Sequence, residues 1–265
     1  MSEQYVLETR NLVKEFKGFV AVDDVNLKIR QGDIHALIGP NGAGKTTVFN
    51  LLTKFLIPTR GRILFKGQDI TAMKSAAIAR KGVVRSFQIS AVFPHMTALE
   101  NIRIALQSFE GNSFSFWQSG NRLNKLNERA MELLDAVGLT RYANTTTVEL
   151  AYGRKRALEL ATTLAMEPEL LLLDEPTQGM GTEDVDRVVE LVRKAAQGRT
   201  VLMVEHNLSV VSKLCDRITV LAQGAVLTEG DYETVSADPR VREVYMGTDA
   251  SGERGAPAAT TETEA

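Results

Sequence analysis

The sequence has a single cysteine, Cys215, among 265 residues, and this excludes an internal disulfide. It follows the apolar run Leu208–Leu214, which favours an inert buried thiol over a nucleophile and fits a reducing cytoplasm. No uninterrupted apolar run approaches the roughly 18 to 20 residues needed to span a bilayer. The segment Met1 to Arg10 has acidic side chains and no apolar stretch, so it does not resemble a secretory signal. Any membrane role is therefore expected to come through a partner.

Charge of one sign is also lacking, because 31 basic residues are balanced by 33 acidic ones. The chain as a whole does not have the strong positive field of many nucleic-acid binders, and no nucleic-acid partner is expected. Apolar residues make up 44% of the sequence, which at this length is ample for a packed core. The composition therefore indicates a folded globular protein.

Short runs rich in β-branched and apolar residues, bounded by Gly, Asp and Pro, predict strands. In the N-terminal part these runs are Val25–Ile29, Ile34–Ile38 and Arg62–Phe65. Further along, a helical pattern at 185–195 separates two continuously apolar runs, Leu170–Leu173 and Thr200–Val204. Such an arrangement is typical of a buried parallel sheet, so the sequence predicts an α/β fold.

Between these two groups of strands, from Thr97 to about Met166, the apolar residues follow helical spacing. Thr97 and Glu100 form a capping-box signature. One helical face carries Leu123, Leu126, Ala130, Leu133, Leu134 and Val137. We therefore expect a core at 1–96 and 167–247, interrupted by a helical insertion at 97–166. Residues 248–265 are too poor in apolar side chains to offset their ordering entropy and are expected to be a disordered tail.

The strand at 34–38 leads into a glycine-rich loop and then a helical run, which is the context of a phosphate-binding loop. The residues concerned are Gly39, Pro40, Asn41, Gly42, Ala43, Gly44, Lys45, Thr46 and Thr47. Glycines let backbone N–H groups converge on phosphate oxygens, Lys45 can reach the β and γ phosphates of ATP, and the Thr46 hydroxyl can ligate Mg²⁺. A glycine-rich turn beside a solvated lysine is a weak alternative, because the fixed positions recur by chance in roughly one chain of this length in a hundred.

Two adjacent acids, Asp174 and Glu175, come at the end of a buried strand, where an open α/β sheet forms its ligand crevice. Side chains alternate along an extended chain, so the two acids can divide the work. Asp174 can face Mg²⁺ through its water shell, and Glu175 can face the attacking water as base or orienter. Without the glycine loop, an ordinary acidic turn would be the favoured explanation.

Three histidines are available. His206 follows the strand at 200–204 and can hydrogen-bond a γ phosphate and the water beside it. His35 lies inside the strand before the glycine loop and His95 lies in a Pro-flanked turn, so we expect structural roles for both. His206 is therefore the one histidine to which we assign catalysis.

Five segments occur in a characteristic order: Gly39 to Thr46, Ser86-Phe87-Gln88, Leu150-Ala151-Tyr152-Gly153, Leu173 to Thr177, and Glu205-His206. In this order the chain resembles the ATP-binding subunits of ABC transporters from about Leu7 to Gly247. The resemblance implies ATP hydrolysis and a P-loop NTPase core of the ABC ATPase type, with an antiparallel β subdomain and an inserted α-helical subdomain. It also implies that Gln88 is linked to Mg²⁺ and water and that Phe16 stacks on adenine. By residue type alone, Phe16 would be a core side chain.

The family's fourth segment usually reads Leu-Ser-Gly-Gly-Gln, and here Ala151, Tyr152 and Arg154 depart from it. The serine hydroxyl that contacts γ phosphate across a dimer is therefore absent. Gly153, the backbone N–H groups and a following helix N-terminus remain suited to an anion, so the resemblance still implies nucleotide contacts for Ala151, Tyr152 and Gly153. Arg154 either assists the anion or is solvated. The loop 178–181 also lacks the family's usual aspartate.

The Leu-Ala-Tyr-Gly sequence is similar to a subgroup that imports branched-chain and other hydrophobic amino acids, or small amides such as urea. Because each segment occurs once, the resemblance implies a homodimer, or a heterodimer with a paralogous subunit. It further implies binding to transmembrane permease subunits at the cytoplasmic face of the inner or plasma membrane, with a substrate-binding protein as an indirect partner. An exporter ATPase, or a soluble ABC ATPase outside transport, is the alternative.

Two apolar groups allow two interpretations each. The first group either lines a groove for a permease helix or fills the core, and consists of Phe87, Val92, Phe93 and Met96. The second group contacts the transmembrane partner or the membrane surface, or else packs beneath the helical insertion, and consists of Phe109, Phe114, Phe116 and Trp117.

Overall fold

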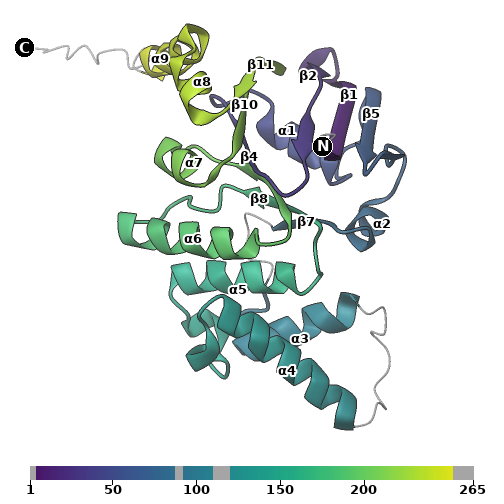
Figure 1. The fold of residues 1–265 in the computed structure, drawn as a ribbon, viewed down its shortest axis with the longest axis vertical. Helices are drawn as coiled ribbons and strands as arrows, with labels where there is room; N and C mark the ends of the chain where they lie inside the picture. Colours follow the sequence, from purple (N-terminus) through teal and green to yellow (C-terminus); the bar gives the residue numbers. More distant parts are fainter. Residues whose placement is uncertain (1–3, 87–91, 110–119, 253–265) are drawn as a thin grey trace, which may run out of the picture.

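A computed structural model describes residues 4–86, 92–109 and 120–252, and within these ranges the strands form two sheets (Figure 1). The first sheet is antiparallel, with the order β2-β1-β5-β6 and with β3 paired to β1. Its strands are β1 (Tyr5–Phe16), β2 (Phe19–Val25), β3 (Lys28–Arg30), β5 (Arg60–Phe65) and β6 (Gln68–Asp69). The antiparallel sheet expected in the N-terminal part is therefore present.

The second sheet has the order β11-β10-β4-β9-β8-β7, and its neighbouring strands are parallel except for β10 and β11. Its strands are β4 (Ile34–Ile38), β7 (Val83–Ser86), β8 (Leu170–Asp174), β9 (Thr200–Val204), β10 (Arg217–Ala222) and β11 (Ala225–Gly230). Every residue of β4, β8 and β9 is buried. Burial on both faces explains why these runs are continuously apolar, and the α/β fold predicted from them is confirmed.

The run Val25–Ile29 is not one strand, and that prediction was wrong. β2 ends at Val25 and β3 begins at Lys28. Between them the Asn26 side chain accepts a hydrogen bond from the Asn11 amide and donates one to the Asp24 carbonyl, each at 2.8 Å. Asp24 itself has a left-handed φ of 48°. Local side-chain hydrogen bonds thus form a turn inside a run whose apolar pattern continues unbroken.

The two faces of the parallel sheet are covered by different elements. On one face, Leu170 and Leu172 pack in a cluster with the antiparallel sheet and with α1 (Lys45–Leu52), to which α2 (Ser75–Arg80) contributes one buried residue. On the other face, Leu171 and Leu173 pack with α5 (Tyr152–Leu164), α6 (Thr182–Ala195) and α7 (Leu208–Leu214). The central strands thus serve two cores through the alternation of their side chains.

The helical insertion consists of α3 (Ala98–Phe109), α4 (Gly120–Ala136) and α5, with short 3₁₀ turns at Thr140–Tyr142 and Thr147–Glu149. In Figure 1, α3 and α4 lie at the end of the molecule remote from the antiparallel sheet. The capping box is confirmed, because the Thr97 amide donates to Glu100 Oε2 at 2.8 Å and the Glu100 amide donates to Thr97 Oγ1 at 3.2 Å. The described part of the predicted apolar face is buried.

The chain continues with α8 (Tyr232–Ala237) and α9 (Pro239–Gly252). Helix α9 extends past residue 247, where the composition placed the start of a disordered tail. Among the described residues, no helix combines the length and the apolar character required to cross a bilayer.

Candidate nucleotide site

The glycine-rich loop connects the end of β4 to the start of α1, as predicted. Gly39 and Gly44 have φ values of +148° and +99°, and a Cβ added to them would lie 2.1 Å from the Leu221 carbonyl oxygen and 2.6 Å from the Ala21 carbonyl oxygen. Glycine is therefore required at both positions for conformation and for close approach to neighbouring backbone. The loop is thereby held at the N-terminus of α1, whose unpaired amides favour an anion.

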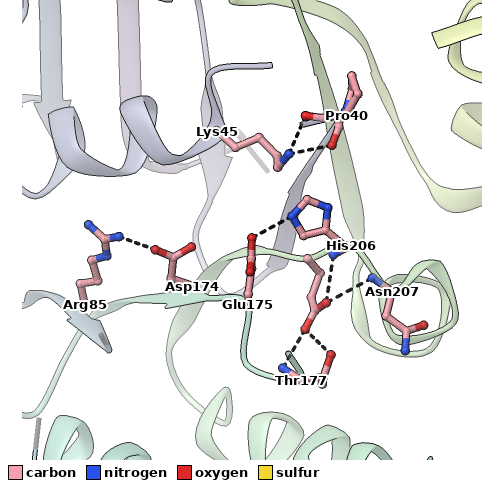
Figure 2. Close-up of polar contacts among 10 residues, drawn as sticks. Pro40, Lys45, Arg85, Asp174, Glu175, Thr177, His206 and Asn207 are labelled. Carbon is pink, nitrogen blue, oxygen red and sulfur yellow. Dashed lines mark hydrogen bonds and ion pairs between the residues drawn. The ribbon is translucent and has the colours of Figure 1, made fainter. Parts of the chain in front are cut away.

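Lys45 is 6% exposed, and its ammonium donates to the Gly39 carbonyl at 2.7 Å and to the Pro40 carbonyl at 2.9 Å (Figure 2). Burial lowers the pKa of Lys45, while the charges of Glu175 and Asp174 act in the opposite direction. The Lys45 ammonium therefore lies close to the negative charges of both acids. Its present acceptors are neutral carbonyls, and charged phosphate oxygens can replace them.

Asp174 closes β8 and is 3% exposed. Its Oδ2 forms an ion pair with the guanidinium of Arg85 at the end of β7 (Figure 2). Arg85 also donates to the Asn50 side chain of α1 at 2.6 Å. The other carboxylate oxygen, Oδ1, is buried without a hydrogen-bond partner. A buried acceptor that keeps one free oxygen is suited to bind a water of a cation's hydration shell.

Glu175 follows immediately and is held differently. Its backbone amide donates to the Val204 carbonyl at 2.9 Å, and its φ is +48°, a left-handed value that costs a non-glycine residue roughly 1 kcal/mol or more. His206, after β9, places Nε2 2.7 Å from Glu175 Oε1 (Figure 2). The side chain of His206 is 42% exposed and that of Glu175 is 12% exposed. The fold therefore brings the second acid and the histidine into direct contact, with the histidine open to solvent.

Glu205 connects the segments that carry these two residues. It is 3% exposed, and its Oε1 accepts hydrogen bonds from the Thr177 amide at 3.0 Å and the Thr177 hydroxyl at 2.6 Å. Its Oε2 accepts from the amides of His206 at 3.0 Å and Asn207 at 3.3 Å. Four hydrogen bonds satisfy the oxygens of this buried carboxylate and connect the two loops.

No role for Arg85 or Glu205 is predicted from the sequence. The only signal for Glu205 is an acid directly after a buried strand, and the signal for Arg85 is a cation at the end of the strand that precedes Phe87 and Gln88. Their partners, Asp174 and Thr177, are far away in sequence, so the contacts could not be read from local spacing.

The Ala151–Gly153 segment lies at the start of α5, with Ala151 as the N-cap residue. Because α5 packs on the opposite face of the parallel sheet from α1, the structure does not bring this segment against the glycine loop of the same chain. Tyr152 is 50% exposed. The Arg154 guanidinium lies 4.2 Å from the centroid of the Tyr142 ring, so this cation stacks on an aromatic of its own helical insertion.

The remaining expected site residues are distributed as follows. Phe16 ends β1, is 40% exposed, and has Lys14 Nζ 4.9 Å from its ring centroid. Thr46 and Thr47 lie in the first turn of α1, where Thr46 is exposed and Thr47 is partly buried. Gln88 lies outside the described residues.

Two of the apolar side chains expected near a groove, Phe93 and Met96, are 51% and 37% exposed, whereas Val92 packs against the core. Val148 is also exposed and lies next to this segment, because its amide donates to the Pro94 carbonyl at 2.9 Å. Phe87 falls outside the described residues, as do three of the four aromatic residues predicted to contact a partner or pack beneath the insertion, Phe114, Phe116 and Trp117.

The structural roles predicted for His35 and Cys215 agree with their environments. His35 is fully buried with Nε2 2.8 Å from the Thr219 hydroxyl, and burial lowers its pKa to about 4. Burial also raises the pKa of the Cys215 thiol to about 12, which disfavours the thiolate.

A contact from the C-terminal part of the chain reaches the glycine loop. Burial raises the pKa of Tyr245 in α9, and a hydrogen bond with the Gly39 backbone opposes that rise. The first glycine of the loop is therefore in contact with the last described helix.

The chain matches two family models. The model of the ABC transporter family matches residues 22–178. A second model, described as branched-chain amino acid ATP-binding cassette transporter, matches residues 225–251, which include α8, Tyr245 and all of α9 except Gly252.

Similar proteins include the high-affinity branched-chain amino acid transport ATP-binding protein BraF of Pseudomonas aeruginosa, with 40% identity over 249 residues that cover 91% of this chain and 98% of the relative. The corresponding protein LivG of Escherichia coli is 38% identical over 251 residues, covering 92% and 98%. A solved structure of the ADP conformation of an ATP-binding cassette of an ABC transporter aligns with a TM-score of 0.81 at 30% identity, covering 92% and 99%. A nucleotide-free cassette aligns with a TM-score of 0.80 at 30% identity, covering 91% and 98%.

Proposed function

Because this chain belongs to the ABC transporter family as an ATP-binding cassette with ATPase activity, we propose that it is the ATP-hydrolysing subunit of an importer for branched-chain or other hydrophobic amino acids. The observation that carries the proposal is the meeting of Lys45, Asp174 and the Glu175–His206 pair at the ends of β4, β8 and β9 (Figure 2). The substrate class is supported by the second family match and by the names of the relatives.

The glycine loop binds the phosphates of ATP through backbone N–H groups of 41–47, and Lys45 moves from its two carbonyl acceptors to phosphate oxygens. Thr46, Gln88 and Asp174 would hold Mg²⁺, with Asp174 acting through a water at its unpartnered Oδ1. When bound, Mg²⁺ neutralises charge on the β and γ phosphates. Phe16 stacks on the adenine.

Glu175 orients the attacking water and accepts its proton, and His206 supports the carboxylate through the 2.7 Å contact while its ring reaches the γ phosphate. The carboxylate can reposition, because it lies at the end of a strand and is partly accessible. The segment that follows it is restrained, because Glu205 ties Thr177 to the His206 segment. Glu175 thus combines a carboxylate that can move with a neighbouring backbone segment that is restrained.

The complete site forms between two chains, either two copies or this chain and a paralogue. Ala151, Tyr152 and Gly153 of one chain close over the phosphates bound by the other, because within one chain they lie on the opposite face of the sheet from the glycine loop. The exposed surface of Phe93, Met96 and Val148 receives a cytoplasmic helix of the permease. The chain is thereby peripheral at the cytoplasmic face of the membrane, and a substrate-binding protein delivers the cargo indirectly.

The test is nucleotide binding and transport by a Lys45→Ala variant. Binding of a fluorescent ATP analogue with Mg²⁺ should weaken by about 100-fold or more, since a buried charge-assisted contact to phosphate is removed. Cells with Lys45→Ala in place of the wild type should lose uptake of labelled leucine, isoleucine and valine. Lys66→Ala is the matched control, because Lys66 forms an exposed ion pair with Glu169, which precedes β8 at the end opposite to Asp174. Undiminished leucine uptake would refute the substrate class, and undiminished binding would refute the site.

A further inference from the structure

Tyr152 joins two segments that both depart from the usual family sequence. Its hydroxyl lies 3.3 Å from the Gln178 carbonyl oxygen, in the loop that follows the two acids. The Arg156 guanidinium approaches the same hydroxyl, with Nε at 3.3 Å and Nη2 at 3.1 Å. A guanidinium can only donate and a carbonyl can only accept, so the single hydroxyl proton points to Gln178. A tyrosine at this position therefore makes a directed contact that glycine cannot make.

The hydroxyl is supported from beneath by a buried ion pair. Arg156 Nη1 donates to Glu159 Oε2 at 2.9 Å, and the side chains of Arg156 and Glu159 are only 12% and 4% exposed. The Arg156 guanidinium carbon also lies 5.4 Å from the centroid of the Tyr152 ring. The orientation of Tyr152 is thus fixed by α5, although half of its surface is exposed.

The loop at the other end of this contact is connected directly to Glu175. The Gln178 amide donates to the Glu175 carbonyl at 3.1 Å, so Gln178 is bonded to Glu175 through its N–H and to Tyr152 through its C=O. The loop contains Gly179, with φ +74°, and Gly181, and neither has any atom within 4 Å of an added Cβ. The Met180 amide also donates to the Thr177 carbonyl at 3.3 Å, and the Gly181 carbonyl accepts from two amides of α6, so both ends of the loop are held by backbone. The Tyr152 hydroxyl adds a side-chain hydrogen bond to Gln178 itself, beside glycines that contribute no packing.

We propose that Tyr152 is a positioning residue that couples the two nucleotide sites of the dimer: its hydroxyl ties the segment that closes the partner's site to the loop that carries the Glu175 of its own chain. This inference rests on the proposed function. In a closed dimer, a nucleotide in the partner's site holds Ala151–Gly153 in place, and the path from Tyr152 through Gln178 transmits that position to Glu175. Each chain then hydrolyses its own ATP when the neighbouring site is filled.

The test is Tyr152→Phe, which removes the hydroxyl and keeps the ring over Arg156. Turnover of the homodimer should fall about three- to tenfold, as expected for the loss of one hydrogen bond, with unchanged affinity of the glycine loop for a fluorescent ATP analogue and an unchanged unfolding midpoint. Tyr232→Phe is the matched control, because Tyr232 is an exposed tyrosine on α8. Unchanged turnover in Tyr152→Phe overturns the inference.

Mixed dimers separate positioning from direct contact with the partner's nucleotide. Two tags allow purification of dimers in which one chain carries Glu175→Gln, so that only the other chain hydrolyses ATP. Tyr152→Phe in the hydrolysing chain should lower turnover by the factor found in the homodimer, because that chain's own Glu175 is affected. A loss seen only when Tyr152→Phe is in the Glu175→Gln chain overturns the inference, since the tyrosine then acts on the nucleotide it covers. Failure of the proposed function shows itself separately, as a wild-type protein that neither binds nor hydrolyses ATP.

Discussion

The buried and the accessible carboxylates of the site are held in contrasting ways. Asp174 and Glu205 are each 3% exposed and each is bound by cations or N–H and O–H donors across two segments of chain. Glu175, beside Asp174 in sequence, pairs instead with a histidine that is 42% exposed. Buried carboxylates are costly to disturb and therefore fix the backbone, whereas the accessible pair can change partners during a reaction. Substitutions should accordingly separate effects on stability from effects on turnover.

The largest expected effect is on turnover, in Glu175→Gln. The amide cannot accept a proton from water, so ATP hydrolysis should fall by about 100- to 10,000-fold. The free energy of unfolding should change by less than about 1 kcal/mol, because the Glu175 side chain is partly exposed. ATP should still bind and should hold the dimer together. Glu190→Gln on α6 is the control, since Glu190 pairs with Arg193 on the surface. Steady-state phosphate release and gel filtration with ATP measure both properties, and normal turnover would contradict the role of Glu175.

Arg85→Met should produce the largest loss of stability. The substitution leaves Asp174 as a buried charge without its cation, which costs about 3 to 5 kcal/mol in the free energy of unfolding. Arg193→Met breaks an exposed pair with Glu190 and should cost less than about 1 kcal/mol. Urea unfolding of the two variants measures the difference, and equal losses would remove the distinction between buried and accessible pairs.

Glu205→Gln should reduce stability and turnover together. One oxygen that accepts two hydrogen bonds is replaced by an amide group that faces donors, at a cost of about 1 to 3 kcal/mol. The loops carrying Glu175 and His206 lose their common anchor, so turnover should fall while the affinity of the glycine loop for ATP stays near the wild-type value. A variant with wild-type turnover would show that the anchor serves the fold alone.

The smallest expected effect is on the pH dependence of stability, and it comes from His35, a buried side chain outside the nucleotide site. Burial lowers the pKa of His35 from its ordinary value of 6.5 to about 4. The pKa of His35 is lower in the folded than in the unfolded state, so protonation favours unfolding. The free energy of unfolding is therefore highest above pH 6.5 and decreases as the pH falls toward 4. Between pH 7 and pH 5 the loss should be about 2 kcal/mol. Urea unfolding at both pH values should show that His35→Gln loses less free energy of unfolding between pH 7 and pH 5 than the wild type does. The control His95→Gln, at an exposed position, should lose as much as the wild type.

Parts of this contrast were accessible from the sequence. Strands β4, β8 and β9 could be predicted because burial on both faces leaves a continuous apolar run, and the acids and His206 followed from their positions at strand ends. The turn at Asn26 was missed, since its cause is a hydrogen bond to Asn11 rather than a break in the apolar pattern.

Contacts between distant segments were not accessible. The pairing of Arg85 with Asp174 and the hydrogen bond from Tyr152 to Gln178 depend on which strands and helices become neighbours. Sequence showed that Tyr152 and the loop 178–181 both depart from the family pattern. Only the fold shows that the two departures touch each other.

The hydrogen bond between Tyr245 and the Gly39 backbone has a consequence for how the protein should be shortened or tagged. A cut after Gly247, suggested by composition, would divide α9, because the helix continues to Gly252. A fusion partner joined there would lie within a few residues of Tyr245, whose side chain contacts the glycine loop. Truncated versions intended to keep native ATP affinity should therefore retain every residue through Gly252.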